Sequence, residues 1–261
     1  MKAVILAGGR GTRLAEETGV RPKPMVEIGG KPILWHIMRL YAHYGIKDFI
    51  VATGYKGWII KEYFANFFLH NNDYEIDIKT GQRQLLNEGS IDWRVAVIDT
   101  GVNTNTAGRV LRLRRWLAGS PFMLTYGDGV ADVDIAALVA FHQGHDRIAT
   151  VTAVRPPARF GALELNGAEV VRFLEKPQTE TGWINGGFFV LDPTFFDYLD
   201  NVDPDDDTQS LERTVLERVG ADQQLMAFTH EGFWHPMDTL RDREILEGLW
   251  ASQRAPWAVW E

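Results

Sequence analysis

The sequence contains no cysteine, so disulfides, zinc–thiolate centres and cysteine nucleophiles are all excluded. It also lacks a long apolar run. No stretch approaches the roughly 18–20 residues of a membrane-spanning helix, and residues 3–7 are too few for the apolar core of a signal peptide. We therefore expect a cytoplasmic protein with no membrane partner.

Basic residues are outnumbered by acidic ones. The chain has 27 Lys and Arg against 35 Asp and Glu, which gives a net charge of −8. Proteins that bind a long phosphate backbone usually present a basic surface, so we expect no nucleic-acid partner. A small anionic ligand is compatible with this balance, because a few well-placed cations are enough to bind it.

What the sequence does contain is a regular alternation of strand and helix patterns. The 261 residues fit one α/β domain whose core is large enough to be stable without a disulfide or a structural metal. Compact apolar runs predict strands at residues 2–6, 49–52, 94–98, 122–125 and 149–154. Apolar residues at helical spacing predict helices at 32–44, 58–68, 108–117 and 135–142. This alternation predicts an α/β fold with a mostly parallel, Rossmann-like sheet and helices on both faces.

The pattern changes after Pro156 and Pro157. Short strand-like pieces at 162–165, 169–174 and 183–190 are separated by glycine, proline or Asn-Gly turns, and they predict a small antiparallel extension. Helical patterns resume at 193–199, 208–219 and 240–250.

Tryptophan is abundant, with nine residues. Trp35 and Trp58 fall on the apolar faces of predicted helices, and we expect both in the core. Trp257 and Trp260 lie at the chain end, where fraying would normally expose them. Packing onto their own domain and burial in a subunit interface are both open for this tail.

A glycine loop, residues 6–14, follows the first predicted strand directly. Without Cβ atoms, its backbone N–H groups can approach phosphate oxygens. The loop carries Arg10 and Arg13, and Lys23 follows between two prolines whose fixed φ angles limit its movement. This density of cations is typical of a triphosphate site from which pyrophosphate departs.

Other phosphate-binding motifs fit less well. A dinucleotide fingerprint needs a third glycine, and Leu14 stands in its place after Gly9 and Gly11, which disfavours a dehydrogenase. The string of a P-loop is absent. A glycine turn without a ligand is the structural alternative.

The loop and Arg-Pro-Lys-Pro-Met at residues 21–25 together resemble the signature of the sugar-1-phosphate nucleotidylyltransferases. Longer strings sharpen the resemblance to the glucose-1-phosphate cytidylyltransferase family. They include Thr-Tyr-Gly-Asp-Gly-Val-Ala-Asp at 125–132, Ile-Asn-Gly-Gly-Phe-Phe-Val at 184–190 and Gly-Phe-Trp-His-Pro-Met-Asp-Thr-Leu-Arg-Asp at 232–242. The resemblance covers essentially the whole chain.

The resemblance implies the reaction of CTP with α-D-glucose 1-phosphate to give CDP-glucose and pyrophosphate. It implies Mg²⁺ as cofactor and in-line attack of the sugar phosphate on the α-phosphorus, a task of positioning and electrostatics. It also implies a homo-oligomer built on trimers and a place in surface polysaccharide (O antigen) biosynthesis. Two alternatives stay open: the same chemistry with dTTP or UTP, and a regulatory subunit that binds nucleotide sugars without catalysis.

The resemblance also implies roles for single residues. Arg13, Lys23 and Asp128 are expected to be catalytic. The expected nucleotide-binding residues are Leu6, Ala7, Gly8, Gly9, Arg10, Gly11, Thr12, Arg13, Lys23, Thr104, Gly108, Arg109 and Gly127.

Two carboxylates are expected to hold the metal. Asp128 follows the strand 122–125, so it lies at the carboxyl edge of a parallel sheet, where ligands of such sheets bind. Asp238 precedes the helix 240–250, and an N-cap is its structural alternative. The resemblance favours both as Mg²⁺ ligands.

The sugar phosphate is expected to bind in the second half of the chain. The residues that the resemblance implies are Gly161, Glu175, Lys176, Asn185 and Gly187. We thus expect one domain over 1–261. Residues 1–154 mainly bind the nucleotide, 155–240 mainly bind the sugar phosphate, and 241–261 form a helix and the aromatic tail.

Overall fold

The computed structural model describes residues 1–87, 91–156, 162–166, 169–174 and 182–260. Its centre is a seven-stranded sheet in the order β14-β10-β13-β8-β1-β4-β7. Four of these strands form the parallel half that the sequence predicts, with β1 pairing both β4 and β8, and β4 pairing β7. They are β1 (Lys2–Ala7), β4 (Asp48–Thr53), β7 (Arg94–Asp99) and β8 (Phe122–Tyr126).

The other half of the sheet is mixed. β13 (Ile184–Leu191) runs antiparallel between β8 and β10 (Ala149–Val154), and β14 (Leu225–His230) is parallel to β10. The predicted antiparallel extension is therefore divided. β13 is inserted into the main sheet, whereas β11 (Ala162–Asn166) and β12 (Glu169–Leu174) pair only with each other. The sequence did not predict β14.

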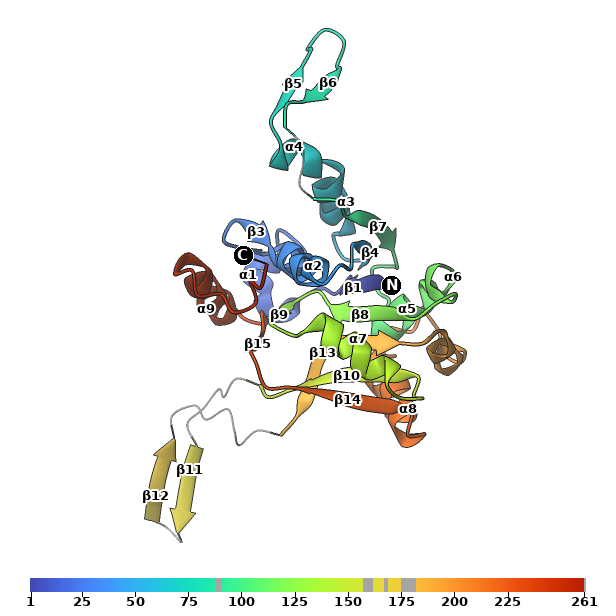
Figure 1. Cartoon of the computed structure of the whole chain (residues 1–261), viewed down its shortest axis with the longest axis vertical. Coiled ribbons are helices and arrows are strands. Elements are labelled where there is room, and N and C mark those ends of the chain that lie inside the picture. The colour runs from blue at the N-terminus through green and yellow to red at the C-terminus, as the bar shows by residue number, and fades with distance from the viewer. Residues whose placement is uncertain (88–90, 157–161, 167–168, 175–181, 261) are drawn as a thin grey trace.

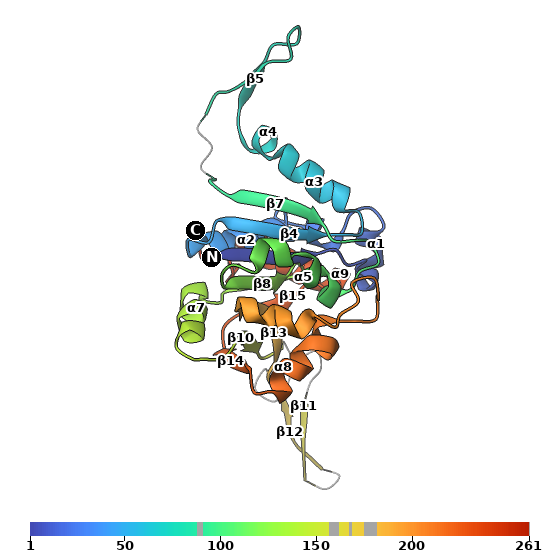
Figure 2. The same cartoon turned by 90° about the vertical axis from the view of Figure 1, so that its right-hand side faces the viewer.

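Alternation along β1 explains why both faces of the sheet carry helices. Ala3, Ile5 and Ala7 belong to one hydrophobic cluster, while Val4 and Leu6 belong to a second on the opposite face. The first cluster is covered by α2 (Ile33–His43), α3 (Gly57–Ala65), α7 (Ile135–Gln143) and α9 (Leu240–Ala251). The second is covered by α5 (Thr106–Arg112), α6 (Arg114–Leu117), α8 (Glu217–Ala221), the 3₁₀ helix Pro193–Leu199 and the π-helix Leu211–Leu216. The two layers are visible in Figure 2.

Shorter elements connect this framework. They are the 3₁₀ turns Thr12–Leu14 and Lys23–Met25, α1 (Ala15–Thr18), β2 (Glu27–Ile28), β3 (Lys31–Pro32), α4 (Phe67–Asn71), β5 (Tyr74–Ile76), β6 (Arg83–Leu85), β9 (Gly129–Ala131) and β15 (Trp234–Pro236). The predicted helix 58–68 is interrupted at Asn66, between α3 and α4, and the predicted helix 108–117 at Leu113, between α5 and α6. In the part of the chain that the structure describes, no helix is long and apolar enough to cross a membrane.

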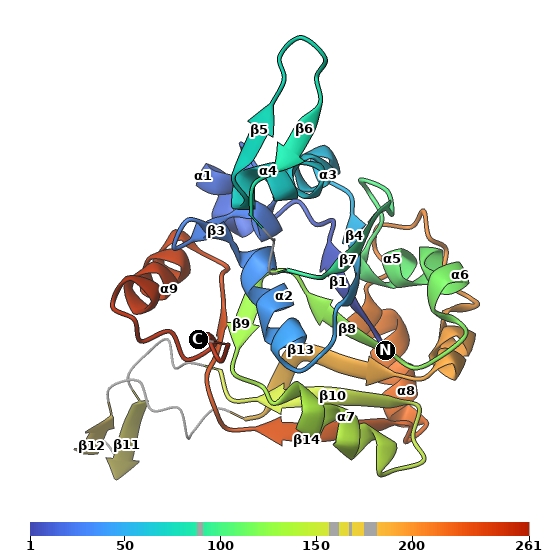
Figure 3. The same cartoon turned by 45° about the horizontal axis from the view of Figure 1, so that its top comes forward.

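An arm, residues 67–87, leaves the body of the molecule. It consists of α4 and the β5–β6 hairpin, which projects well beyond the sheet in Figures 1 and 3. All six residues of the two strands are exposed. The sequence predicted no hairpin here. The prediction that Trp58 is in the core was wrong, since this α3 residue near the arm is 64% exposed.

The aromatic tail packs onto its own domain. Trp257 is only 1% exposed and stacks on Trp250 and Phe233. Its indole N–H donates to Nδ1 of His36 (3.3 Å), and the Trp260 ring lies against Trp35. Figures 1 and 3 show the C-terminus beside α2, which carries His36.

The contacts of His36 fix its protonation state. An indole N–H can only donate and a carbonyl can only accept, so Nδ1 accepts from Trp257 while Nε2 donates to the Ile28 carbonyl oxygen (2.9 Å). Burial lowers the pKa of His36 to about 4. Because the folded-state pKa is below the unfolded value, this histidine contributes stability above pH ~6.5 that is lost as the pH falls toward 4.

Replacing Trp257 with alanine tests how much the tail contributes to the fold. The change removes a fully buried indole and leaves Nδ1 of His36 without a hydrogen-bond donor. We expect the free energy of unfolding, measured by chemical denaturation at pH 7, to fall by about 3–5 kcal/mol. Trp58→Ala is the control, because this exposed indole should cost no more than about 0.5 kcal/mol. Equal losses in the two variants would contradict the packing described here.

Candidate active site

A pocket of about 280 Å³ opens at the carboxyl ends of β1 and β8. This is the edge of an open α/β sheet at which ligands bind. The glycine loop forms one wall and the segment leading into α5 forms another. The lining residues are Leu6, Ala7, Gly8, Gly9, Gly11, Thr12, Arg13, Lys23, Pro24, Thr104, Asn105, Thr106, Arg109, Tyr126, Gly127 and Asp128.

Arg109 holds the glycine loop in place. Its guanidinium donates to the carbonyl oxygens of Gly8 (2.9 Å), Gly101 (2.7 Å) and Thr53 (3.1 Å), and to Thr100 Oγ1 (2.8 Å). It therefore ties the ends of β1, β4 and β7 together. A Cβ on Gly8 would lie 2.2 Å from the guanidinium carbon, so only glycine allows this approach. Burial lowers the pKa of Arg109 to about 10, which leaves the group charged at neutral pH.

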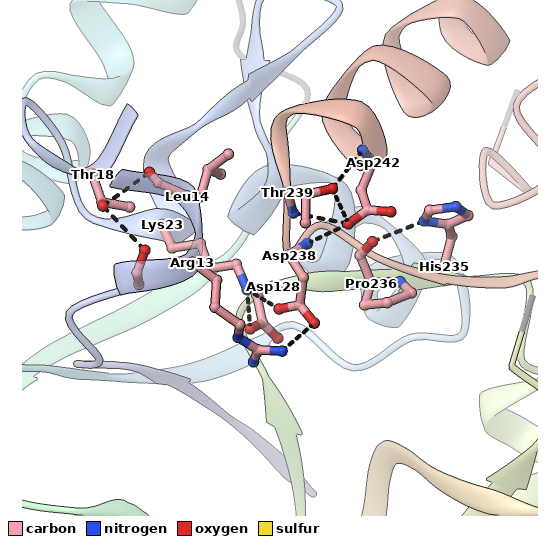
Figure 4. A network of polar contacts seen from close by, with 11 residues as sticks. Arg13, Leu14, Thr18, Lys23, Asp128, His235, Pro236, Asp238, Thr239 and Asp242 are labelled. Atoms are coloured by element: carbon pink, nitrogen blue, oxygen red, sulfur yellow. Dashed lines mark hydrogen bonds and ion pairs between the residues drawn. The ribbon is translucent and has the colours of Figure 1, made fainter. Parts of the chain in front are cut away.

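A cluster of four charged side chains lies beside the loop (Figure 4). The Lys23 ammonium donates to Asp128 Oδ2 (2.8 Å) and to Asp238 Oδ1 (2.6 Å), and Arg13 donates to Asp238 Oδ2 (2.7 Å). The side chain of Lys23 is 8% exposed and that of Asp238 is 13% exposed. The ammonium thus bridges two carboxylates that would otherwise repel each other. We call these four residues the charge cluster.

A short β-ladder brings the two carboxylates together. β9 follows Asp128 and pairs antiparallel with β15, which precedes Asp238. At the end of this ladder, the Met237 N–H donates to the Asp128 carbonyl oxygen (2.7 Å). Both aspartates therefore lie at the same end of the ladder.

Asp238 is not the N-cap of α9. Thr239 takes that position and forms a capping box with Asp242: Thr239 Oγ1 accepts from the Asp242 N–H (3.2 Å), and Asp242 Oδ2 accepts from the Thr239 N–H (2.8 Å). The N-cap alternative for Asp238 is thereby excluded. Its carboxylate is directed into the charge cluster instead.

The charge cluster has the chemistry of a site for a hard divalent cation. Two carboxylates from separate segments converge on the Lys23 ammonium, and Mg²⁺ typically uses one or two carboxylates together with water and phosphate oxygens. Among the described residues, no group of three or more His, Asp or Glu side chains could hold a metal. Asp128 and Asp238 therefore fit an ion whose remaining ligands come from water and substrate.

Two of the predicted sugar-site residues lie next to the pocket wall. Asn185 Nδ2 donates to the hydroxyl of Tyr126 (3.2 Å), and Asn185 Oδ1 accepts from the Gly187 N–H (2.8 Å). Gly187 has φ +82°, and a Cβ there would lie 2.5 Å from the Tyr126 ring. Gly161, Glu175 and Lys176 lie outside the described residues.

Two predicted nucleotide-binding residues do not line the pocket. Arg10 is exposed and donates to Asn103 Oδ1 (2.9 Å). Gly108 instead faces Pro204 and Thr104, where a Cβ would meet Pro204 Cα at 2.9 Å. A nucleotide role for either residue stays a prediction.

Sequence reasoning missed four lining residues: Pro24, Asn105, Thr106 and Tyr126. A signal was present for Asn105, which caps α5 by accepting from the Thr106 N–H (2.7 Å), because Asn is a preferred N-cap. Tyr126 precedes the predicted Gly127 and Asp128. No sequence pattern points to it, because its position depends on how β8 and β13 pair.

Comparison with known proteins agrees with this geometry. The family model described as nucleotidyl transferase matches residues 2–242. The proteins named glucose-1-phosphate cytidylyltransferase from Salmonella typhimurium and Salmonella typhi are each 52% identical over 262 residues, covering 100% of both chains. A structure of UDP-glucose pyrophosphorylase complexed with UDP-glucose has a TM-score of 0.67 at 16% identity and covers 97% of this chain and 99% of that one, a likeness of fold.

Proposed function

The chain belongs to the nucleotidyl transferase family, and on that premise we propose that it makes CDP-glucose and pyrophosphate from CTP and α-D-glucose 1-phosphate. The observation that carries the proposal is the charge cluster beside the glycine-loop pocket, in a chain 52% identical to glucose-1-phosphate cytidylyltransferases over its full length. The geometry supports nucleotidyl transfer. The choice of CTP and glucose 1-phosphate as substrates rests on the names of the full-length relatives.

The reaction needs no protein nucleophile. A phosphate oxygen of glucose 1-phosphate forms a bond to the α-phosphorus of CTP while the bond from that phosphorus to the leaving oxygen breaks, and pyrophosphate departs. The attacking phosphate is already largely ionised at neutral pH, so no base has to remove a proton. The protein has to align two polyanions and neutralise the charge that moves onto the leaving group.

We assign these tasks to the residues as follows. The backbone N–H groups of the loop and the side chains of Arg13 and Lys23 hold the triphosphate and stabilise the departing pyrophosphate. Arg109 keeps the loop in its binding shape. Asn185 and Gly187, with Gly161, Glu175 and Lys176, bind the sugar phosphate. Asp128 and Asp238 hold Mg²⁺, which when bound offsets the charge of both phosphates.

Two alternatives are less well supported. The same chemistry with dTTP or UTP would use the same loop and cations, and the full-length relatives favour CTP. A non-catalytic regulatory subunit would have no need for Lys23, Asp128 and Asp238 in mutual contact. We further propose that the enzyme works in the cytoplasm, where CTP is available, and that its product supplies surface polysaccharide (O antigen) synthesis.

Pyrophosphate release tests the proposal. We expect rapid release from CTP and glucose 1-phosphate in the presence of Mg²⁺, release at least roughly tenfold slower from dTTP, UTP or ATP, and none measurable in excess EDTA. Release with all four nucleotides at similar rates, or with none, would contradict the assignment. A preference for dTTP or UTP would establish the first alternative.

Matched carboxamide variants test the two metal ligands. Asp128→Asn and Asp238→Asn each remove one anionic ligand, so turnover with CTP should fall by about 10²–10³ or more. Asp146→Asn is the control, because this exposed aspartate precedes β10 at the amino ends of the strands, away from the pocket at the carboxyl ends of β1 and β8. Circular dichroism should show that all three variants are folded. Near-normal turnover of Asp128→Asn at saturating Mg²⁺ would overturn the assignment.

We also propose that the chain forms a homo-oligomer built on trimers. Trp257 of the tail is buried on its own domain, which argues against the tail as the interface. The arm instead exposes apolar side chains, including Phe68 (57%), Ile78 (84%) and Leu86 (61%). A two-stranded hairpin without a partner is marginally stable in water, and clustered apolar exposure marks an interaction site. A second copy of the chain is the partner that the resemblance to oligomeric relatives supports.

Light scattering on the arm variant Ile78→Lys/Leu86→Lys tests this surface. We expect the full chain to give a mass that is a multiple of three times 29.5 kDa, and the variant to give a smaller one. Met226→Lys is the control, because Met226 is an exposed apolar residue on the opposite edge strand β14. A wild-type mass of 29.5 kDa would reject the oligomer. An unchanged mass of the arm variant would place the interface elsewhere.

A further inference from the structure

Glu212 does not line the pocket, yet its carboxylate contacts two residues that do. The Tyr126 hydroxyl donates to Glu212 Oε1, and the Thr106 hydroxyl lies 3.4 Å from Glu212 Oε2. Glu212 belongs to the π-helix Leu211–Leu216, where the sequence predicts a regular helix, and such π segments frequently occur at functional sites. The π-helix is itself attached to the pocket wall, since the Leu211 N–H donates to Thr106 Oγ1 (2.7 Å).

We propose that Glu212 is a positioning residue for recognition of the sugar, acting through Tyr126 on the amide of Asn185. The proposal rests on the proposed function, because it assumes that the sugar phosphate binds beside Asn185. It adds a role for a residue that touches neither substrate nor metal.

The direction of each hydrogen bond follows from the chemistry of the partners. A carboxylate can only accept, so Tyr126 has to donate its single hydroxyl proton to Glu212. The Tyr126 oxygen is then left as an acceptor, and the group that reaches it is Nδ2 of Asn185 (3.2 Å).

This chain of bonds decides which way the Asn185 amide faces. With Nδ2 directed at Tyr126, Oδ1 faces the Gly187 N–H and accepts from it (2.8 Å). A flipped amide would place two acceptors together at Tyr126 and two donors together at Gly187. The side chain of Asn185 is exposed, so its second N–H and the second lone pair of Oδ1 can reach a sugar hydroxyl. A site built to hydrogen-bond a hydroxyl discriminates strongly against analogues that lack it.

Without Glu212, the Tyr126 hydroxyl loses the acceptor that fixes its proton. The hydroxyl can then rotate and donate to Asn185, which removes one of the two contacts that oppose the flipped amide. The nucleotide loop on the other side of the pocket keeps its own support, because Arg109 holds it through carbonyl groups that Glu212 does not contact. The effect should therefore fall on the sugar half of the reaction.

Steady-state kinetics of Glu212→Leu and Glu212→Gln test the proposal. For Glu212→Leu we expect the KM for glucose 1-phosphate to rise about 10- to 100-fold, the factor that corresponds to loss of one hydrogen bond to a charged group. The KM for CTP should change less than about threefold. Glu212→Gln keeps a carbonyl acceptor for Tyr126, so it should recover most of the wild-type KM. Glu217→Leu is the matched control, since Glu217 is an exposed glutamate directly after the π-helix.

Deoxy analogues provide a readout that a purely structural role would not change. Wild-type enzyme should discriminate against at least one of the 2-, 3-, 4- and 6-deoxyglucose 1-phosphates, and Glu212→Leu should lose most of that discrimination. Tyr126→Phe keeps the ring that packs on Gly187 and removes the hydroxyl, so it should give the same loss. Tyr126→Phe also tests the proposal if Glu212→Leu does not fold. The double variant should be no worse than either single one.

The possible failures are distinguishable. If the wild-type protein makes no CDP-glucose, the proposed function is wrong. If it does, and Glu212→Leu and Tyr126→Phe keep the wild-type KM for glucose 1-phosphate and its deoxy discrimination, only the role of Glu212 is wrong. An equal or larger rise in the KM for CTP would also overturn that role, because it would assign Glu212 to the nucleotide through Thr106.

Discussion

The contact of one ammonium group with two carboxylates is the constraint on which the rest of the site depends. Lys23 contacts Asp128 and Asp238 across sequence separations of 105 and 215 residues. These contacts join the 3₁₀ turn Lys23–Met25 to both strands of the β9–β15 ladder. Breaking a largely buried pair of this kind by removing one partner leaves an uncompensated charge and is strongly destabilising. The prolines beside Lys23 and the β9–β15 ladder both hold the geometry in which this charge is balanced. Under the proposed function, Asp128 and Asp238 would hold a metal ion that offsets phosphate charge, and Lys23 would be available to the phosphates of the nucleotide.

The sheet supplies two supports around that centre, one on each side of it. Arg109 fixes the glycine loop by donating hydrogen bonds to carbonyl oxygens at the ends of three parallel strands. On the other side, β13 enters the sheet antiparallel to β8, which places Asn185 and Gly187 against Tyr126. Parallel pairing therefore changes to antiparallel pairing at β8, the strand whose Tyr126 lines the pocket and contacts Asn185.

Residues with strong local signals could be predicted from the sequence. The apolar runs of β1, β4, β7 and β8 identify buried strands, and Asp128 follows one of them, so its place at the sheet edge follows directly. The features that the sequence did not predict depend on contacts between residues far apart in the chain. The insertion of β13 into the sheet, the π-helix that carries Glu212 and the exposure of Trp58 are set by tertiary packing, which periodicity does not report. Asp238 was ambiguous for the same reason, because only the structure shows that Thr239 takes the capping position.

A crystal structure with Mg²⁺ and a non-hydrolysable CTP analogue would show directly which groups contact the Asp128 and Asp238 carboxylates when substrate is bound. We expect a metal ion about 2.0–2.1 Å from an oxygen of Asp128 and of Asp238, with the Lys23 ammonium moved onto the triphosphate. A metal ion bound elsewhere, with Lys23 still bridging Asp128 and Asp238, would contradict this expectation.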